Sequence, residues 1–217
     1  MTGQELLDYL RVDVLRDNAL PYLWSDDLIL RMLSEAESQF ARKTYALASN
    51  TPTITTVVGT STYAVPTGSL YVFSAAISTS ARDLSNYTRK VIPSNLASAS
   101  GTPQLFVNDE SSRTIRLYPV PDAVVTVNLR TARLPAAAIT LYTSPEIPEE
   151  YHLDLAEYVA WRLLQSNDAD GSSTNASDRH RVDWLNRLSD AKREYYRFRM
   201  GSNPTAVQSW TFRRNGS

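Results

Sequence analysis

The sequence predicts an α+β protein with helices at both chain ends, a β-rich middle part and a short extended tail. Apolar residues recur with the 3.6-residue helical period near both ends. The middle part is rich in Thr, Val and Ile and alternates between polar and apolar residues. We therefore expect N-terminal helices in 1–50, a β-rich insertion in 51–146, C-terminal helices in 147–200 and an extended C-terminal arm in 201–217. The helices of the two ends should form one antiparallel bundle, and the insertion a sandwich or a barrel-like sheet.

Two helices are expected before residue 50. The first covers 3–16, because its apolar residues fall on one helical face: Leu6, Leu7, Leu10 and Val14. The second begins after Ser25, a residue type that caps helices, and Asp26 and Asp27 suit the positive end of the helix dipole. We expect it to run to about residue 48, before the Asn-Thr-Pro sequence at 50–52.

The middle part contains several short β-type segments. Two of them, 53–58 and 62–65, are separated by a glycine and predict a hairpin. Further strands are expected at 70–78, 113–118 and 124–130, with a proline-rich turn between the last two. The last strand alternates clearly, and its apolar face is formed by Val125, Val127 and Leu129.

Helical periodicity returns at residue 148. Pro148 suits the first turn of a helix that should reach about residue 164. The polar segment 167–177 predicts a loop, and 178–200 predicts a last helix. The apolar stripe of that helix consists of Trp184, Leu188, Ala191 and Tyr195.

Nothing in the composition or the motifs indicates catalysis. The chain has no cysteine, and its two histidines, His152 and His180, have no nucleophile motif to serve. The sequence DADG at 168–171 resembles half of a calcium loop, but Arg179 stands where the loop needs a glutamate. We therefore expect no enzymatic activity, no cofactor and no metal site.

The first residues lack the basic start and the apolar core of a signal peptide. There is also no run of about 20 apolar residues that could span a bilayer. From this we expect no membrane partner.

Charge is distributed unevenly along the chain. The formal net charge is −1, yet residues 179–217 alone carry +6. Basic residues gather on the last helix, where the candidates for a positive surface are Arg187, Lys192, Arg193, Arg197 and Arg199. Interleaved acids favour a solvated face with intrahelical pairs for most of this helix. Its arginine-rich end also fits a surface that meets phosphates or an acidic protein.

The tail after residue 200 combines apolar and basic residues. It contains Val207, Trp210 and Phe212, followed by Arg213 and Arg214. A tail of this length cannot form its own core, and exposed aromatic residues are unfavourable in water. We expect the tail either to fold back on its own chain or to insert into a partner.

An ordered series of short motifs resembles the head-to-tail adaptor (connector, or head completion) proteins of tailed bacteriophages. The motifs are LWSDDL (23–28), TYAVP (62–66), GTPQ (101–104), IRLYPVP (115–121) and IPEEYH (147–152). The resemblance covers most of residues 20–165 and does not include the tail.

This resemblance implies a virion structural protein at the head–tail interface, assembled in the host cytoplasm. Such adaptors commonly form a ring of twelve copies between the portal protein and the tail, around the channel through which the DNA leaves. The C-terminal arm often reaches the portal, so we expect Val207, Trp210, Phe212, Arg213 and Arg214 to bind it. Two other functions stay open at this point. One is a nucleic-acid-binding module that uses the basic end, and the other is a virion protein that binds a receptor or glycan through the β-rich part.

Overall fold

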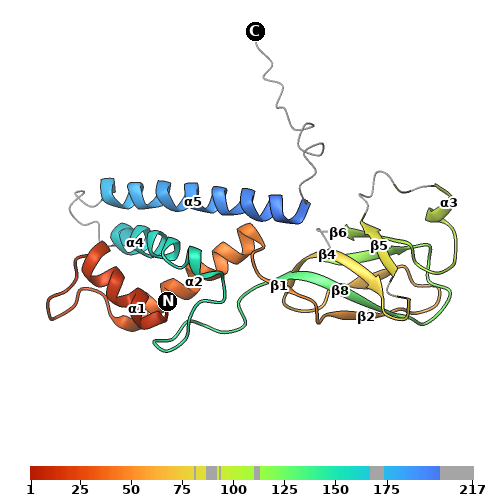
Figure 1. Ribbon diagram of the computed structural model, residues 1–217, viewed down its shortest axis with the longest axis horizontal. Helices are drawn as coiled ribbons and strands as arrows, with labels where there is room; N and C mark the ends of the chain where they lie inside the picture. The colour runs from red at the N-terminus through yellow and green to blue at the C-terminus, as the bar shows by residue number, and fades with distance from the viewer. Residues whose placement is uncertain (81, 87–91, 93, 110–112, 167–173, 201–217) are drawn as a thin grey trace, which may run out of the picture. The chain divides into compact units, whose positions relative to one another are not determined.

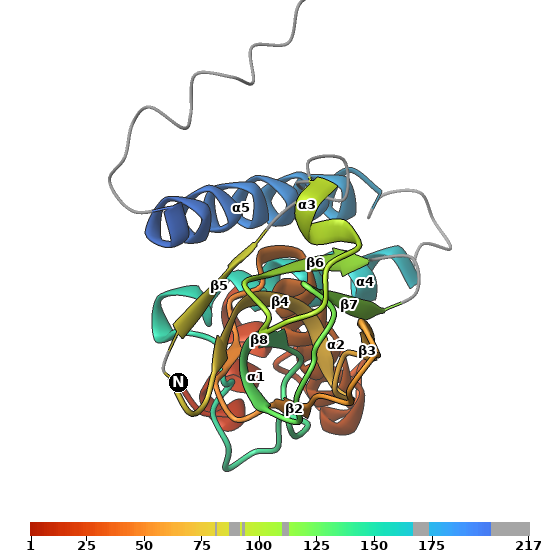
Figure 2. The same ribbon diagram turned by 90° about the vertical axis from the view of Figure 1, so that its right-hand side faces the viewer.

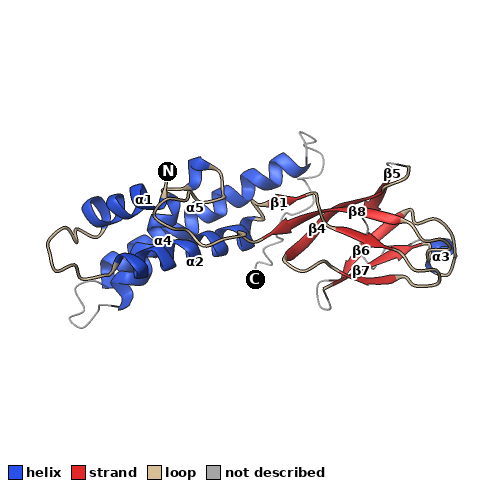
Figure 3. Cartoon of the chain, turned by 90° about the horizontal axis from the view of Figure 1, so that it is seen from below, coloured by secondary structure: helices blue, strands red, loops and turns tan. Residues whose placement is uncertain are grey.

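The computed structural model describes residues 1–80, 82–86, 92, 94–109, 113–166 and 174–200. The chain divides into two compact units (Figure 1). Residues 1–36 and the described residues between 139 and 200 form the helical unit, and the described residues of 37–138 form the sheet unit. Figure 3 shows that the described strands all belong to the sheet unit. The expected arm, 201–217, lies outside the described residues.

The first helix lies where the periodicity predicts it. It consists of α1 (Gly3–Tyr9) and a continuing π-helical turn, η1 (Leu10–Val14). Thr2 and Glu5 form a capping box, because each side chain accepts a hydrogen bond from the other residue's backbone. A Cβ atom on Gly3 would lie 2.1 Å from the carbonyl oxygen of Thr140, so this close approach of two segments requires glycine.

Helix α2 (Asp26–Thr44) begins as expected, since the hydroxyl of Ser25 accepts a hydrogen bond from the backbone of Leu28. It ends four residues before the expected position. The reason is local: Tyr45 has a positive φ of 55°, which leaves the right-handed helical region. The hydroxyl of Thr44 also donates to the carbonyl of Phe40 and accepts from the backbone of Ala46.

The sheet unit contains one curled sheet of eight strands among the described residues (Figure 2). The strands are β1 (Ala48–Ser49), β2 (Thr53–Thr55), β3 (Thr62–Ala64), β4 (Ser69–Ile77), β5 (Arg82–Asn86), β6 (Leu105–Asp109), β7 (Thr114–Tyr118) and β8 (Thr126–Arg133). Their order is β1-β8-β4-β5-β6-β7-β3, and β2 also pairs with β8. All described pairings are antiparallel except β5 with β6. A short helix, α3 (Ser94–Ala97), precedes β6.

The sheet curls like half a barrel around a single apolar core. The core includes Val72, Phe106, Leu117, Val127 and Leu129, each at most 1% exposed. On β8 the expected alternation is confirmed for Val127 and Leu129, which are buried between exposed Asn128 and Arg130. The barrel-like alternative therefore describes this part better than a sandwich of two sheets.

The expected hairpin of 53–58 and 62–65 is wrong. Strand β2 pairs with β8, and β3 pairs with β7, on the two halves of the sheet. The connection between them is held by other bonds, because Gly59 donates to Pro121 and Thr56 exchanges hydrogen bonds with Val125. Pairing with the longer strands β7 and β8 lets Ile54 and Tyr63 join the common core, which a local hairpin would not achieve.

The C-terminal helices differ slightly from their expected limits. Pro148 precedes a single 3-10 turn, η3 (Glu149–Tyr151), and α4 (Asp154–Ser166) follows. Helix α5 (Thr174–Met200) begins four residues before the expected residue 178. The earlier start is stabilised by Ser177, which is buried and donates to the carbonyl of Trp161. Every helix in the described ranges is too short or too polar to cross a bilayer.

Candidate assembly surfaces

Helices α4 and α5 pack side by side and run antiparallel. Asp154, at the start of α4, pairs with Arg187 in the middle of α5. Further along α4, the carbonyl of Trp161 accepts a hydrogen bond from Ser177 near the start of α5. The expected stripe of α5 forms this contact, since Trp184 and Ala191 are buried. The ring of Trp184 lies edge-on to Tyr158, with centroids 5.4 Å apart. One face of α5 is therefore buried against α4 inside the helical unit.

Polar groups at the edge of this contact are paired. His180 lies 2.7 Å from Glu157, and the hydroxyl of Tyr151 donates to Glu194 over 2.7 Å. Burial and the Glu194 carboxylate together raise the pKa of Tyr151 well above its usual value. Burial also raises the pKa of Asp154, although the hydrogen bond from Arg187 acts in the opposite direction. These contacts hold α5 against α4.

The basic residues of α5 fall into two groups. Arg187 pairs with Asp154 and Glu157, and Arg193 lies 3.2 Å from Asp190. Lys192 and Arg197 are exposed and have no acidic partner within the described part of the chain. The side chain of Arg199 lies outside what the structure describes. Of the predicted positive surface, Lys192 and Arg197 thus remain available to a partner.

A second apolar face of α5 points to solvent. We call it the outer stripe; its members are Val182, Leu185 and Tyr196, which are 52%, 50% and 48% exposed. Their spacing of three and eleven residues places them on one side of a helix, away from the buried stripe of Trp184 and Ala191. The described chain leaves this face uncovered.

The segment 15–25, here the N-terminal loop, displays a further apolar surface. Two of its leucines are exposed, Leu20 by 79% and Leu23 by 58%. Just before the segment, Val12 is 56% exposed. Sequence reasoning missed this surface, because the segment shows no periodicity and contains a proline that marks a break. The available signal was three large apolar residues, Leu20, Tyr22 and Leu23, in a short interhelical connection.

Buried polar contacts hold the N-terminal loop in place. The guanidinium of Arg11 donates to Asp17 over 2.8 Å, to the carbonyl of Trp24 over 2.8 Å and to Asp26. The carboxylate of Asp17 in turn accepts from the backbones of Leu23 and Trp24. Arg11 and Asp17 are only 6% and 7% exposed at their side chains. The loop is therefore a defined structure and not a loose connection.

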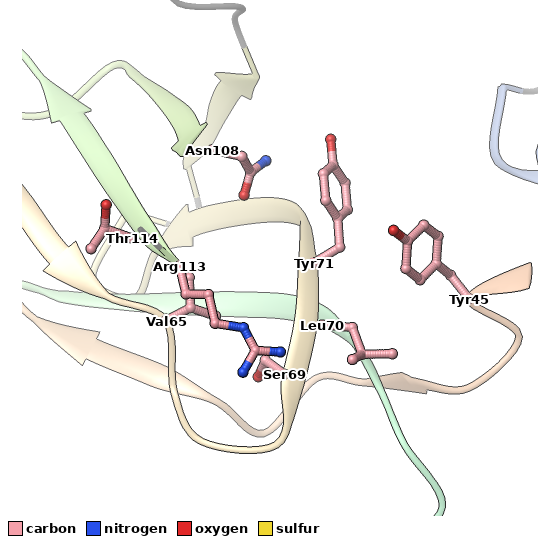
Figure 4. Close-up of a pocket in the computed structure, with 8 residues that line it drawn as sticks. All are labelled: Tyr45, Val65, Ser69, Leu70, Tyr71, Asn108, Arg113 and Thr114. Carbon is pink, nitrogen blue, oxygen red and sulfur yellow. The ribbon is translucent and has the colours of Figure 1, made fainter. Parts of the chain in front are cut away.

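The sheet unit contains a pocket of about 140 Å³ (Figure 4). It is lined by Tyr45, Val65, Ser69, Leu70, Tyr71, Asn108, Arg113 and Thr114. The rings of Tyr45 and Tyr71 stack with centroids 5.8 Å apart, and Phe73 packs beside Tyr71. One face of each tyrosine is thereby covered, which limits how these rings could stack on a sugar. Nowhere in the described residues do three or more His, Asp or Glu side chains gather in a way that suits a metal ion.

The family model of the SU10 adaptor protein matches residues 1–208, which include both units. The chain belongs to the SU10 adaptor protein family. A search of curated proteins found no match. The membership confirms the resemblance to phage head-to-tail adaptors and implies an adaptor role in the phage virion. The SU10 adaptor family is a family of structural proteins and not of enzymes.

The SU10 adaptor match also extends beyond the resemblance seen in the sequence, because it includes residues before 20 and after 165. It covers Val207 of the expected portal-binding residues. All five of these residues, Val207, Trp210, Phe212, Arg213 and Arg214, lie outside the described part of the chain.

Proposed function

We propose that copies of this adaptor form a ring between the portal and the tail, through whose channel the genome leaves the head. The family match over residues 1–208 carries this proposal, since it includes both compact units. The fold supports it: two apolar surfaces of the helical unit are left exposed by the described residues, and such surfaces suit contacts with other chains. A ring of twelve copies, as in the adaptors that the sequence resembles, is the expected assembly.

Docking to the portal is assigned to the C-terminal arm. Its aromatic and arginine residues are of the types that dominate protein interfaces, with Trp210 and Phe212 as anchors. Removing all residues after Met200 should abolish binding to purified portal rings, measured by co-sedimentation and negative-stain electron microscopy. The circular dichroism of the shortened chain should match that of the full chain, because the described cores end before this point. A control with Arg213→Ala alone should retain part of the binding. Unchanged binding of the shortened chain would refute this assignment.

The basic end of α5 is proposed to face the DNA channel or a neighbouring subunit. Lys192, Arg197 and Arg199 are the residues concerned, because Arg187 and Arg193 already pair with acids of the same chain. Because the formal net charge of the chain is −1 and acids are interleaved with the bases of α5, the isolated chain should bind duplex DNA weakly. Fluorescence anisotropy at roughly 50 and 200 mM salt measures this. Tight binding that falls steeply with salt would instead favour the nucleic-acid-binding module.

A further inference from the structure

We propose that the N-terminal loop of one copy binds the outer stripe of α5 on the next copy. This assignment names the surfaces of the ring and therefore rests on the proposed function. The contact joins two different faces. Each subunit binds one neighbour through its N-terminal loop and the other neighbour through its outer stripe. Such a head-to-tail contact closes into a ring when the rotation between copies allows it.

The N-terminal loop has the properties of a preformed binding surface. Leu20 and Leu23 are more than half exposed, although large apolar side chains in water are unfavourable when they cluster. The buried pair of Arg11 and Asp17 fixes the backbone that carries them. The guanidinium of Arg11 also lies 3.9 Å from the ring centre of Tyr22. A loop that is already ordered loses little conformational entropy when a partner binds.

The two faces lie on opposite sides of helix α4. Tyr158 of α4 donates to Glu35 of α2 on one side and packs on Trp184 of α5 on the other. Figures 1 and 2 both show α5 on one side of α4, with α1 and the first half of α2 on the other. The N-terminal loop connects η1 to α2, so it belongs to the layer opposite α5. A head-to-tail contact requires two different faces, and these two are separated by α4.

The charges around the two faces are complementary. The only charged residues of the N-terminal loop itself are Arg16 and the buried Asp17. Residues 3–27, which add the helical residues on both sides of the loop, carry six acidic and two basic residues, a net charge of −4. Helix α5 carries seven basic and four acidic residues, apart from its histidine, a net charge of +3. Exposed Asp13 and Asp27 have no basic partner among the described residues, and neither Lys192 nor Arg179 has an acidic one there. Opposite fields favour contact between these two faces over contact of either face with itself.

Disulfide trapping tests the contact directly, because the chain has no cysteine of its own. Leu23→Cys and Leu185→Cys are combined in the full-length chain and oxidised at high concentration, then separated on a non-reducing gel. The expected result is a ladder of dimers, trimers and larger species. Each single variant alone should give at most a trace of dimer. Val58→Cys, which replaces an equally exposed residue of the sheet unit, serves with Leu185→Cys as the matched control and should give no ladder.

Mixing two blocked variants separates a head-to-tail contact from a symmetric one. Leu23→Ser removes one face and Leu185→Ser the other, and each variant alone should lose ring formation in sedimentation velocity. Their mixture retains one intact loop and one intact stripe, so it should form a discrete heterodimer. The absence of both the ladder and the heterodimer would overturn this inference. If wild-type rings are still seen with portal, the proposed function would survive that result; if wild-type rings are absent too, both would fail.

Discussion

Arg11 shows how one buried charge determines the shape of a surface. Its guanidinium contacts residues 6, 13 and 15 positions further along, at Asp17, Trp24 and Asp26. A buried cation without partners would be strongly unfavourable, so these contacts are a condition of the fold. They also place Leu20 and Leu23 in solvent, where a partner can reach them.

We predict that Arg11→Ala lowers the free energy of unfolding by about 3 kcal/mol, because it leaves Asp17 buried without its main cationic partner. Urea denaturation followed by circular dichroism measures this loss. Arg31→Ala removes an exposed arginine of α2 and should change the stability by less than about 0.5 kcal/mol. A similar small effect for both variants would show that the Arg11 network does not contribute to stability.

For single residues, the sequence predicts contacts between near neighbours in the chain, but not contacts that depend on the path of a loop. The Ser25 cap depends on residues three apart in sequence, and the structure confirms it. The Arg11–Asp17 pair looks in the sequence like ordinary surface charges near a helix end. Its burial follows only from the path of the loop, which leaves no local trace in composition.

Among the secondary-structure elements, α4 is the central one of the helical unit. Its residue Tyr158 is 5% exposed and connects three helices, through Glu35 of α2, Trp161 of α4 itself and Trp184 of α5. Burial is the main cause that raises the pKa of Tyr158 to about 12, and the hydrogen bond to Glu35 adds to it. The protonated hydroxyl is thus part of the packing between the helices.

This pKa predicts how stability depends on pH. The folded state holds the Tyr158 proton more tightly than the unfolded state, whose pKa is near 10. Its contribution to stability is therefore complete below about pH 10 and is lost as the pH rises towards 12.

We expect Tyr158→Phe to lower the stability at pH 8 by about 1.5 kcal/mol, through loss of the bond to the Glu35 carboxylate. The variant should also weaken the fall of stability above pH 10, measured by chemical denaturation at several pH values. Tyr142→Phe, at a residue 90% exposed, should change neither quantity.

The helices were predictable to within a few residues because their apolar stripes repeat along one segment. The strands were predictable as segments, but their partners were not. Strand β2 has only three residues, and the neighbour that it finds is β8, about seventy positions away in sequence. The alternation on a short strand specifies which face is buried and does not specify which strand lies beside it. The sequence also did not reveal the outer stripe of α5. Its apolar residues alternate along the helix with those of the buried stripe, and the sequence does not show which of the two stripes a neighbouring helix covers.

For the whole molecule, the notable property is that one compact unit is formed by the middle of the chain. Strand β1 pairs with β8, so the chain enters and leaves the sheet at neighbouring positions. Every member of the sheet core lies between Ile54 and Leu129. An insertion with adjacent ends and its own core can fold without the rest of the chain. That the expected insertion, 51–146, folds independently of the helices is therefore a proposal.

We predict that a fragment of residues 44–135 folds on its own. It keeps all eight described strands and the stacked rings of Tyr45 and Tyr71, and about ninety residues suffice for an independent core. The fragment should show a β-type circular dichroism spectrum and a cooperative urea transition. Phe106→Ala in the same fragment removes a fully buried ring and should cost about 3–5 kcal/mol, enough to leave it largely unfolded. An unfolded wild-type fragment would mean that the sheet unit depends on the helical unit, and that the adaptor folds as one cooperative whole.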